Sequence, residues 1–97
     1  MLPIIFTPAA RAEVIEVWDW YETILPGLGD RLQDEIDDAI ELIASNPQMF
    51  GVVFQDVRRT LLRKFPYGLF FRIESDAIYI MACFHSSRNP RIWQRRA

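Results

Sequence analysis

Two hydrophobic periods divide this chain into a helical part and a strand-forming part. From about residue 8 to residue 45, apolar side chains recur every three or four positions, which is typical of amphipathic helices. From residue 57 onward, β-branched and aromatic residues come in short runs that turn-forming residues separate. The order of these patterns predicts an α+β fold with its helices first and most of its strands last.

The first part of the chain predicts one strand and a pair of helices. Residues 2–6 are apolar and form a short strand. Thr7 followed by Pro8 marks a helix start, because threonine caps free N–H groups and proline lacks one. A Pro-Gly-Leu-Gly turn at residues 26–29 separates this helix from a second one that begins near Asp30. We therefore expect an antiparallel helical hairpin with an acidic outer face.

The last part of the chain predicts a meander of three antiparallel strands, over residues 57–64, 68–73 and 77–84. With the N-terminal strand they make one small sheet, and the chain is long enough for a single domain, residues 1–97. The last strand carries apolar residues on both sides, whereas two helices cover only one face of a small sheet. We therefore expect the other face to be exposed, apolar and fringed by arginines, which favours a binding partner.

Charge is sorted along the chain, although the net charge is only −2. Residues 1–41 contain ten acidic residues and two arginines, whereas residues 42–97 contain nine basic and three acidic residues. Segregated charge creates a field that interspersed charge cancels. The second half of the chain is therefore expected to present a basic surface to a polyanion or to an acidic protein.

Composition excludes several classes of protein. No run approaches the roughly 20 apolar residues that a membrane helix needs, and the N-terminus lacks the basic start of a signal peptide. Cys83 is the only cysteine, which excludes an internal disulfide and the usual cysteine and histidine zinc site. No glycine-rich loop connects a strand to a helix, so no nucleotide cofactor is expected. We expect a cytoplasmic protein without metal, cofactor or membrane contact.

One histidine, at a predicted strand end, is the candidate for acid–base chemistry. Cleavage of RNA needs a base for the 2′-hydroxyl group, a cation at the phosphorus and an acid for the leaving oxygen. His85, Tyr79 and either Arg63 or Arg72 could supply these groups. The alternative is that His85 is a structural hydrogen-bonding residue, because perturbed catalytic histidines are the less common case.

Basic residues also cluster on one predicted strand. Period-two alternation places Arg59 and Arg63 on one side of this strand and Arg58 and Lys64 on the other. These residues either contact nucleic acid or protect an edge strand from aggregation. In the C-terminal segment, Trp93 either closes the chain end onto the core or stacks on a base.

The order of these motifs resembles a known family. After the strand and the helical hairpin come Arg58-Arg59-x-Leu61-Leu62-Arg63-x-Phe65-Pro66-Tyr67, Phe71-Arg72-Ile73, Ile78-x-Ile80 and Phe84-His85-x-x-Arg88-x-Pro90-x-x-Trp93. Over almost the whole chain, this arrangement resembles the RelE/ParE superfamily of type II toxin–antitoxin toxins. Within that superfamily it is most similar to the ParE-like, plasmid-stabilisation branch.

The resemblance implies a small toxin that a cognate ParD-like antitoxin holds inactive. ParE-like toxins inhibit DNA gyrase by binding, whereas RelE-like toxins cleave messenger RNA on the ribosome. No hydroxylated aromatic residue follows His85 here, and this departure from the nuclease pattern favours a toxin that is not an enzyme. Messenger RNA cleavage is the first alternative, and a non-toxic nucleic-acid-binding or interaction module is the second. A toxin–antitoxin complex of this kind would bind operator DNA through its antitoxin.

On this interpretation the candidate binding residues fall into two groups. Antitoxin contacts combine apolar side chains beside the helices with residues of the sheet that meet acidic groups. The residues expected in this group are Trp18, Tyr21, Arg59, Arg63, Arg72, Tyr79 and Met81. The residues expected to contact the target lie in the C-terminal segment and are His85, Arg88, Arg91 and Trp93.

Overall fold

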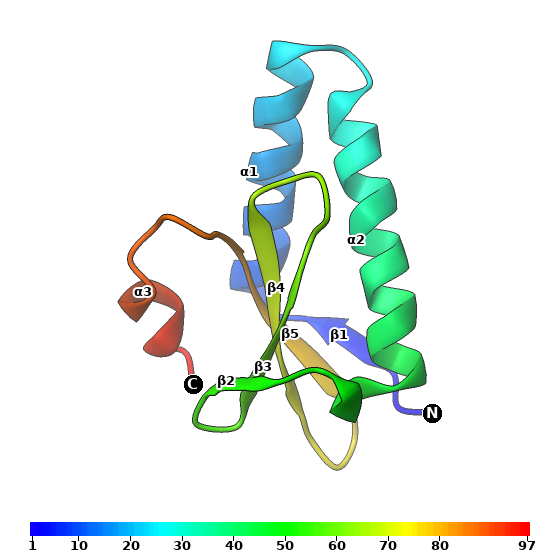
Figure 1. Ribbon diagram of the computed structural model, residues 1–97, viewed down its shortest axis with the longest axis vertical. Helices are drawn as coiled ribbons and strands as arrows, with labels where there is room; N and C mark the ends of the chain where they lie inside the picture. The colour runs from blue at the N-terminus through cyan, green and yellow to red at the C-terminus, as the bar shows by residue number, and fades with distance from the viewer.

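All strands of the protein form one mixed sheet beside a long helical hairpin (Figure 1). The computed structural model describes residues 1–97. The elements are β1 (Ile4–Phe6), α1 (Pro8–Ile24), α2 (Leu28–Ser45), the 3₁₀ helix η1 (Pro47–Met49), β2 (Val52–Phe54), β3 (Val57–Leu61), β4 (Tyr67–Ile73), β5 (Ile78–His85) and α3 (Arg91–Gln94). The predicted α+β fold is confirmed. None of the helices combines the length and the apolar character needed to cross a membrane.

The sheet has the strand order β1-β5-β4-β3-β2, and its central strands β3, β4 and β5 form the predicted antiparallel meander. At one edge β1 runs parallel to β5, with Ile4 opposite Ile78, so the sheet is mixed. At the other edge β2, which the hydrophobic pattern does not predict, pairs with β3 through an irregular register. The side chains of Val52 and Val53 remain 50% and 39% exposed. β2 therefore lacks the buried alternation by which a strand is recognised in a sequence.

Local sequence explains where the two long helices begin. The hydroxyl of Thr7 accepts a hydrogen bond from the N–H of Ala10 at 3.2 Å, which confirms the predicted cap of α1. α2 begins at Leu28, slightly before the expected position. Gly29 is buried there, and a Cβ atom on it would lie 2.8 Å from the carbonyl oxygen of Trp18. The close approach of α1 and α2 therefore requires glycine at this position.

The hairpin of α1 and α2 covers one face of the sheet, as expected. Its helices bury apolar side chains against alternate residues of β4 and β5. The buried residues of this cluster are Ala10, Val17, Leu32, Ile36, Ala39, Ile43, Leu62, Phe65, Leu69, Phe71, Ile78, Ile80 and Cys83. We call this side of the sheet the hairpin face.

The opposite side of the sheet, which we call the tail face, is covered as well, and the prediction of an exposed apolar face was wrong. The C-terminal segment returns over this side, where α3 lies apart from the hairpin (Figure 1). The ring of Trp93 stacks on Phe70 with centroids 4.3 Å apart and meets Phe54 edge-on at 5.9 Å. Only 5% of Trp93 remains exposed. Of its two predicted roles, Trp93 has the packing role.

A bulge in β5 changes which residues of this strand face each side of the sheet. Phe70 pairs with Ala82 and Phe71 pairs with Ile80, so Met81 is an extra residue with no partner of its own in β4. An extra residue reverses which side the following residues face. Ile80 packs in the hairpin-face core, whereas Met81 and Ala82 are both buried on the tail face. Met81, expected at the antitoxin interface, is only 4% exposed and belongs to the core instead.

A side-chain latch holds the end of the chain to α1. The guanidinium of Arg96 donates to both carboxylate oxygens of Glu13, with each distance 2.9 Å. Arg96 also donates to the carbonyl of Met81 at 3.0 Å, and Glu13 accepts from the N–H of Cys83 at 3.1 Å. β1 pairs only with the first residues of β5, so these two side chains satisfy backbone groups that no strand reaches.

Candidate functional site

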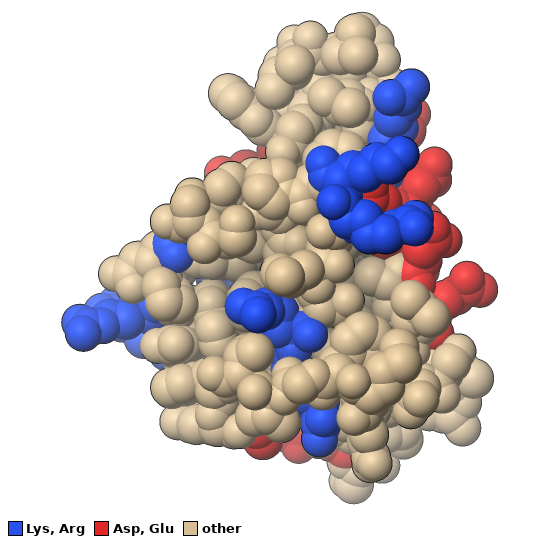
Figure 2. All heavy atoms as spheres, viewed as in Figure 1, with Lys and Arg blue, Asp and Glu red and all other residues tan.

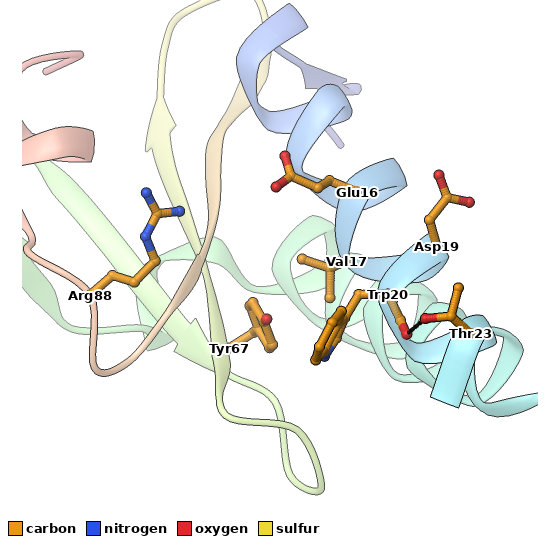
Figure 3. Close-up of a pocket in the computed structure, with 7 residues that line it drawn as sticks. All are labelled: Glu16, Val17, Asp19, Trp20, Thr23, Tyr67 and Arg88. Carbon is orange, nitrogen blue, oxygen red and sulfur yellow. Dashed lines mark hydrogen bonds between the residues drawn. The ribbon is translucent and has the colours of Figure 1, made fainter. Parts of the chain in front are cut away.

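The C-terminal end of β5 lies between two hollows of the surface, and Arg88 lines both. The first hollow, which we call the α1 groove, has a volume of about 510 Å³. It is lined by Glu16, Val17, Asp19, Trp20, Thr23, Tyr67 and Arg88 (Figure 3). The second, which we call the donor pocket, has a volume of about 190 Å³ and lies on the tail face. It is lined by Arg59, Leu61, Gly68, Phe70, Phe84, His85, Ser86, Arg88, Pro90 and Trp93.

The α1 groove is apolar inside and charged at its rim. Figure 3 shows the ring of Trp20 turned toward Tyr67, with Arg88 on the far side of the gap. Trp20 is 60% exposed although tryptophan is among the residues with most to gain from burial. Glu16 and Asp19 lie on the same helix and give the α1 side of the groove a negative charge. An exposed tryptophan beside other apolar side chains, with charged residues around them, is typical of a protein-binding site.

The imidazole of His85 is held by its neighbours at the mouth of the donor pocket. The backbone N–H of Ser87 donates to Nδ1 of His85 at 3.0 Å, and the Ser87 hydroxyl oxygen lies 2.8 Å from the same atom. The ring packs edge-on against Tyr67 with centroids 5.0 Å apart. Because Nδ1 accepts a hydrogen bond, the neutral ring carries its proton on Nε2. His85 lines the donor pocket, and in this tautomer its other ring nitrogen, Nε2, is a hydrogen-bond donor.

Two arginines complete the donor pocket. The guanidinium of Arg88 lies over the ring of Phe84, 4.7 Å from its centroid. Arg59 extends from β3 across Gly68, where a Cβ atom would lie 3.4 Å from its Cγ atom. Neither arginine forms an ion pair, because the salt bridges of the protein join Arg72 to Asp56 and Arg96 to Glu13. The pocket therefore combines uncompensated positive charge with an apolar floor.

The residues predicted for RNA cleavage are not brought together by the fold. Tyr79 lies near the start of β5 and His85 at its end, a separation of roughly 20 Å along a strand. Arg72 pairs with Tyr79 across the sheet and binds Asp56 at 3.0 Å. The hydroxyl of Tyr79 donates to Asp76 at 2.9 Å, and this hydrogen bond raises the pKa of Tyr79. These groups cannot act on the same phosphodiester as His85.

The three arginines expected to meet the antitoxin also lie apart. β3 ends at Leu61, before the predicted end of its strand, so Arg63 lies in the following loop. There the carboxylate of Glu35 accepts the N–H groups of Arg63 and Lys64 at 2.8 and 3.2 Å. Arg63 shares a third hollow with Arg31 and Lys64, whereas Arg59 lines the donor pocket and Arg72 binds Asp56.

The charge segregation of the sequence is only partly preserved on the surface. Figure 2 shows Lys and Arg gathered beside the row of Asp and Glu along one edge and in separate groups elsewhere on this face. Folding places Arg31, Arg63 and Lys64 next to the acidic side chains of α2. The basic residues therefore form several separate groups, and a single broad basic surface is not found.

Two of the aromatic residues expected at the antitoxin interface instead pack against other residues of the toxin. Trp18 donates its indole N–H to Asp30 at 3.3 Å and packs between the two helices. Tyr21 packs edge-on against Phe65 and Tyr67, and its burial raises its pKa. Trp20 is the aromatic residue of α1 that faces solvent. One sequence signal could have identified Trp20 as exposed. Glu16, one helical turn earlier, and Asp19, the preceding residue, are both acidic.

Of the residues expected to contact the target, some lie at the surface and one is buried in the core. His85 and Arg88 line the donor pocket, and Arg91 is exposed at the start of α3. Trp93 forms the buried floor of the pocket and offers no free ring to a target. Burial raises the pKa of Cys83 to about 12, so its thiol stays protonated and unreactive. No three His, Cys, Asp or Glu side chains lie close enough together to hold a metal ion.

Comparison with solved structures supports the fold described above. The structure matches one chain of a solved structure described as the chromosomal ParDE toxin–antitoxin system from P. aeruginosa, with a TM-score of 0.66. The match covers 88% of this chain and 96% of the other, at 19% sequence identity. At that identity the likeness establishes a common fold and no shared activity.

Sequence comparison then identifies the family. Residues 4–90 match the family model of the ParE toxin of the type II toxin–antitoxin system parDE. The protein described as toxin ParE2, found in two strains of Mycobacterium tuberculosis, is 32% identical over 79 residues. That alignment covers 80% of this chain and 75% of the relative. The chain therefore belongs to the ParE toxin family of type II toxin–antitoxin systems, which confirms the resemblance found in the sequence.

Proposed function

We propose that a ParD-like antitoxin neutralises this toxin by seating an apolar segment in the α1 groove, and that the free toxin acts by binding DNA gyrase. The observation that carries the antitoxin site is Trp20, which stands 60% exposed in a groove whose other apolar walls are Val17 and Tyr67. A partner helix or strand that covers these side chains would gain most from the tryptophan.

The choice of a binding toxin over a nuclease rests on the end of β5. His85 offers Nε2–H, and the other predicted catalytic groups lie elsewhere in the fold. RNA cleavage on the ribosome is thereby less well supported than inhibition by contact, in which His85, Arg88 and Arg91 bind the target. Both gyrase and the ribosome are cytoplasmic, and the proposal places the toxin there. Binding of operator DNA by the complex is assigned to the antitoxin.

Antitoxin binding is tested by replacing Trp20 with alanine. We expect the affinity for the antitoxin encoded by the adjoining gene to fall at least about tenfold, because an exposed tryptophan at an interface centre contributes roughly 2 kcal/mol or more. Met49→Ala is the matched control, since Met49 is 54% exposed and lines neither hollow. Isothermal titration calorimetry measures both. An equal loss in the two variants would contradict the proposed groove.

The mode of action is tested on the same purified toxin after removal of the antitoxin. We expect gyrase-catalysed supercoiling to be blocked while messenger RNA stays intact in a translating extract. Transcript cleavage that His85→Ala abolishes would instead identify a ribosome-dependent nuclease. Salt-sensitive binding to nucleic acid without growth arrest would identify the non-toxic module.

A further inference from the structure

The donor pocket contains hydrogen-bond donors without a matching acceptor group. Its charged lining residues are Arg59 and Arg88, and no Asp or Glu is among the residues that line it. His85 adds its Nε2–H group, because Nδ1 is occupied by Ser87. A guanidinium presents a fixed fork of N–H donors that matches an oxyanion. The chemistry of the pocket is therefore that of an oxyanion receptor, without a base for catalysis.

The donor pocket adjoins the α1 groove. Arg88 lines both hollows, and Tyr67 of the groove packs against His85 of the pocket. A polypeptide that covers Trp20 and continues past Arg88 therefore enters the pocket that Arg59 also lines. The partner of the groove is the natural source of an anion for the pocket.

Surrounding charge favours a carboxylate over the phosphates of a nucleic acid. A polyanion on this path would pass Glu16 and Asp19 in the α1 groove, which repel it. Proteins that hold single strands also stack bases on exposed rings. The rings in this pocket, those of Phe70, Phe84 and Trp93, are 6%, 2% and 5% exposed. A single carboxylate needs neither an extended basic track nor a stacking surface.

We propose that an acidic side chain of the antitoxin occupies the donor pocket between Arg59 and Arg88, and so covers the surface by which the toxin meets its target. The inference rests on the proposed antitoxin groove and extends it. Neutralisation is then direct competition, because the antitoxin carboxylate and the target both need Arg88, and the carboxylate would also cover the pocket that His85 lines. Salt weakens this contact more than the apolar contact with Trp20.

The first experiment uses the isolated full chain and two probes: sodium acetate and a short thymidine oligonucleotide. NMR spectra of the arginine Nε–H groups follow each titration. We expect saturable shifts at Arg59 and Arg88 with acetate, which Arg59→Gln weakens at least about fivefold and Arg95→Gln leaves unchanged. Arg95 is an exposed arginine of the same tail that lines neither hollow. No saturable shift with acetate, or tighter binding of the oligonucleotide that Arg59→Gln abolishes, overturns the proposal.

The second experiment measures affinity for the antitoxin encoded beside this chain. We expect Arg59→Glu to weaken binding about tenfold or more and to lower its salt dependence, with Arg95→Glu within about twofold of the unchanged toxin. Equal affinities of the two variants would overturn the proposal while leaving the Trp20 groove in place. If the unchanged toxin does not bind the antitoxin, the proposed function is contradicted. In that case the acetate titration alone tests whether the pocket binds a carboxylate.

Discussion

The two faces of the sheet are closed in different ways. On the hairpin face two long helices, α1 and α2, bury a core of 13 residues, whereas the tail face has a core of six beneath the four-residue helix α3. The short cover depends on two contacts, the stack of Trp93 on Phe70 and the latch between Arg96 and Glu13. Regions with few buried contacts open locally at low cost. The candidate site thus borders the face that we expect to be less stable.

The largest expected effect is on the free energy of unfolding, and it distinguishes unfolding of the whole protein from local unfolding of the tail. Phe71→Ala removes a fully buried ring from the hairpin face and should lower the free energy of unfolding by about 4 kcal/mol. Trp93→Ala should cost about 3 kcal/mol, with much of the effect confined to the tail. Urea unfolding measures the totals, and amide exchange locates them. Equal loss of protection in α2 and in the tail after Trp93→Ala would show that the two faces unfold as one unit.

A smaller effect is expected at the latch. Arg96→Ala removes both hydrogen bonds to Glu13 and leaves a carboxylate whose side chain is only 16% exposed, so the cost should be about 2 kcal/mol. Glu13→Gln, which can still accept from the N–H of Cys83, should cost less. A double-mutant cycle between the two positions measures the coupling. Additive costs would mean that the tail is held by Trp93 alone.

The smallest effect, when it is measured only up to pH 10, concerns the hairpin face and arises from the pKa of Cys83. Burial, with a further contribution from Glu13, raises the pKa of this thiol from 9.0 to about 12. Between these pH values the unfolded chain loses the proton and the folded chain keeps it. The contribution of Cys83 to stability is therefore complete below pH 9 and is lost as the pH rises toward 12, by at most about 1.4 kcal/mol per pH unit.

Unfolding curves between pH 8.5 and 10 test this expectation by comparing the unchanged protein with Cys83→Ala, a variant that lacks the thiol and retains all the tyrosines. The alanine variant should lose stability less steeply as the pH rises. In the unchanged protein, a thiol reagent should react only as fast as this region opens. Rapid modification of the folded chain at neutral pH would show that the hairpin face is as open as the tail face.

Sequence patterns predicted the features that depend on neighbouring residues. Thr7 and Pro8 start α1 because capping is a local interaction, and the predicted strands lie close to β3, β4 and β5. The family could also be identified from the order of its motifs. β2 could not be predicted, because three residues at an exposed edge leave no periodic pattern. Nor could the bulge at Met81, since a bulge is defined only by the partner strand.

The sequence alone determined the α+β order of elements, the family and the presence of a tryptophan able to close the chain end onto the core, because these follow from local preferences and motif order. Tertiary structure decided that Trp93 and Met81 are buried, that Trp20 faces solvent, and that Arg59 joins Arg88 rather than Arg72. The reason is physical. Burial and charge pairing depend on which distant segments of the chain come into contact. These contacts are determined by the strand register and by the path of the C-terminal segment back over the sheet.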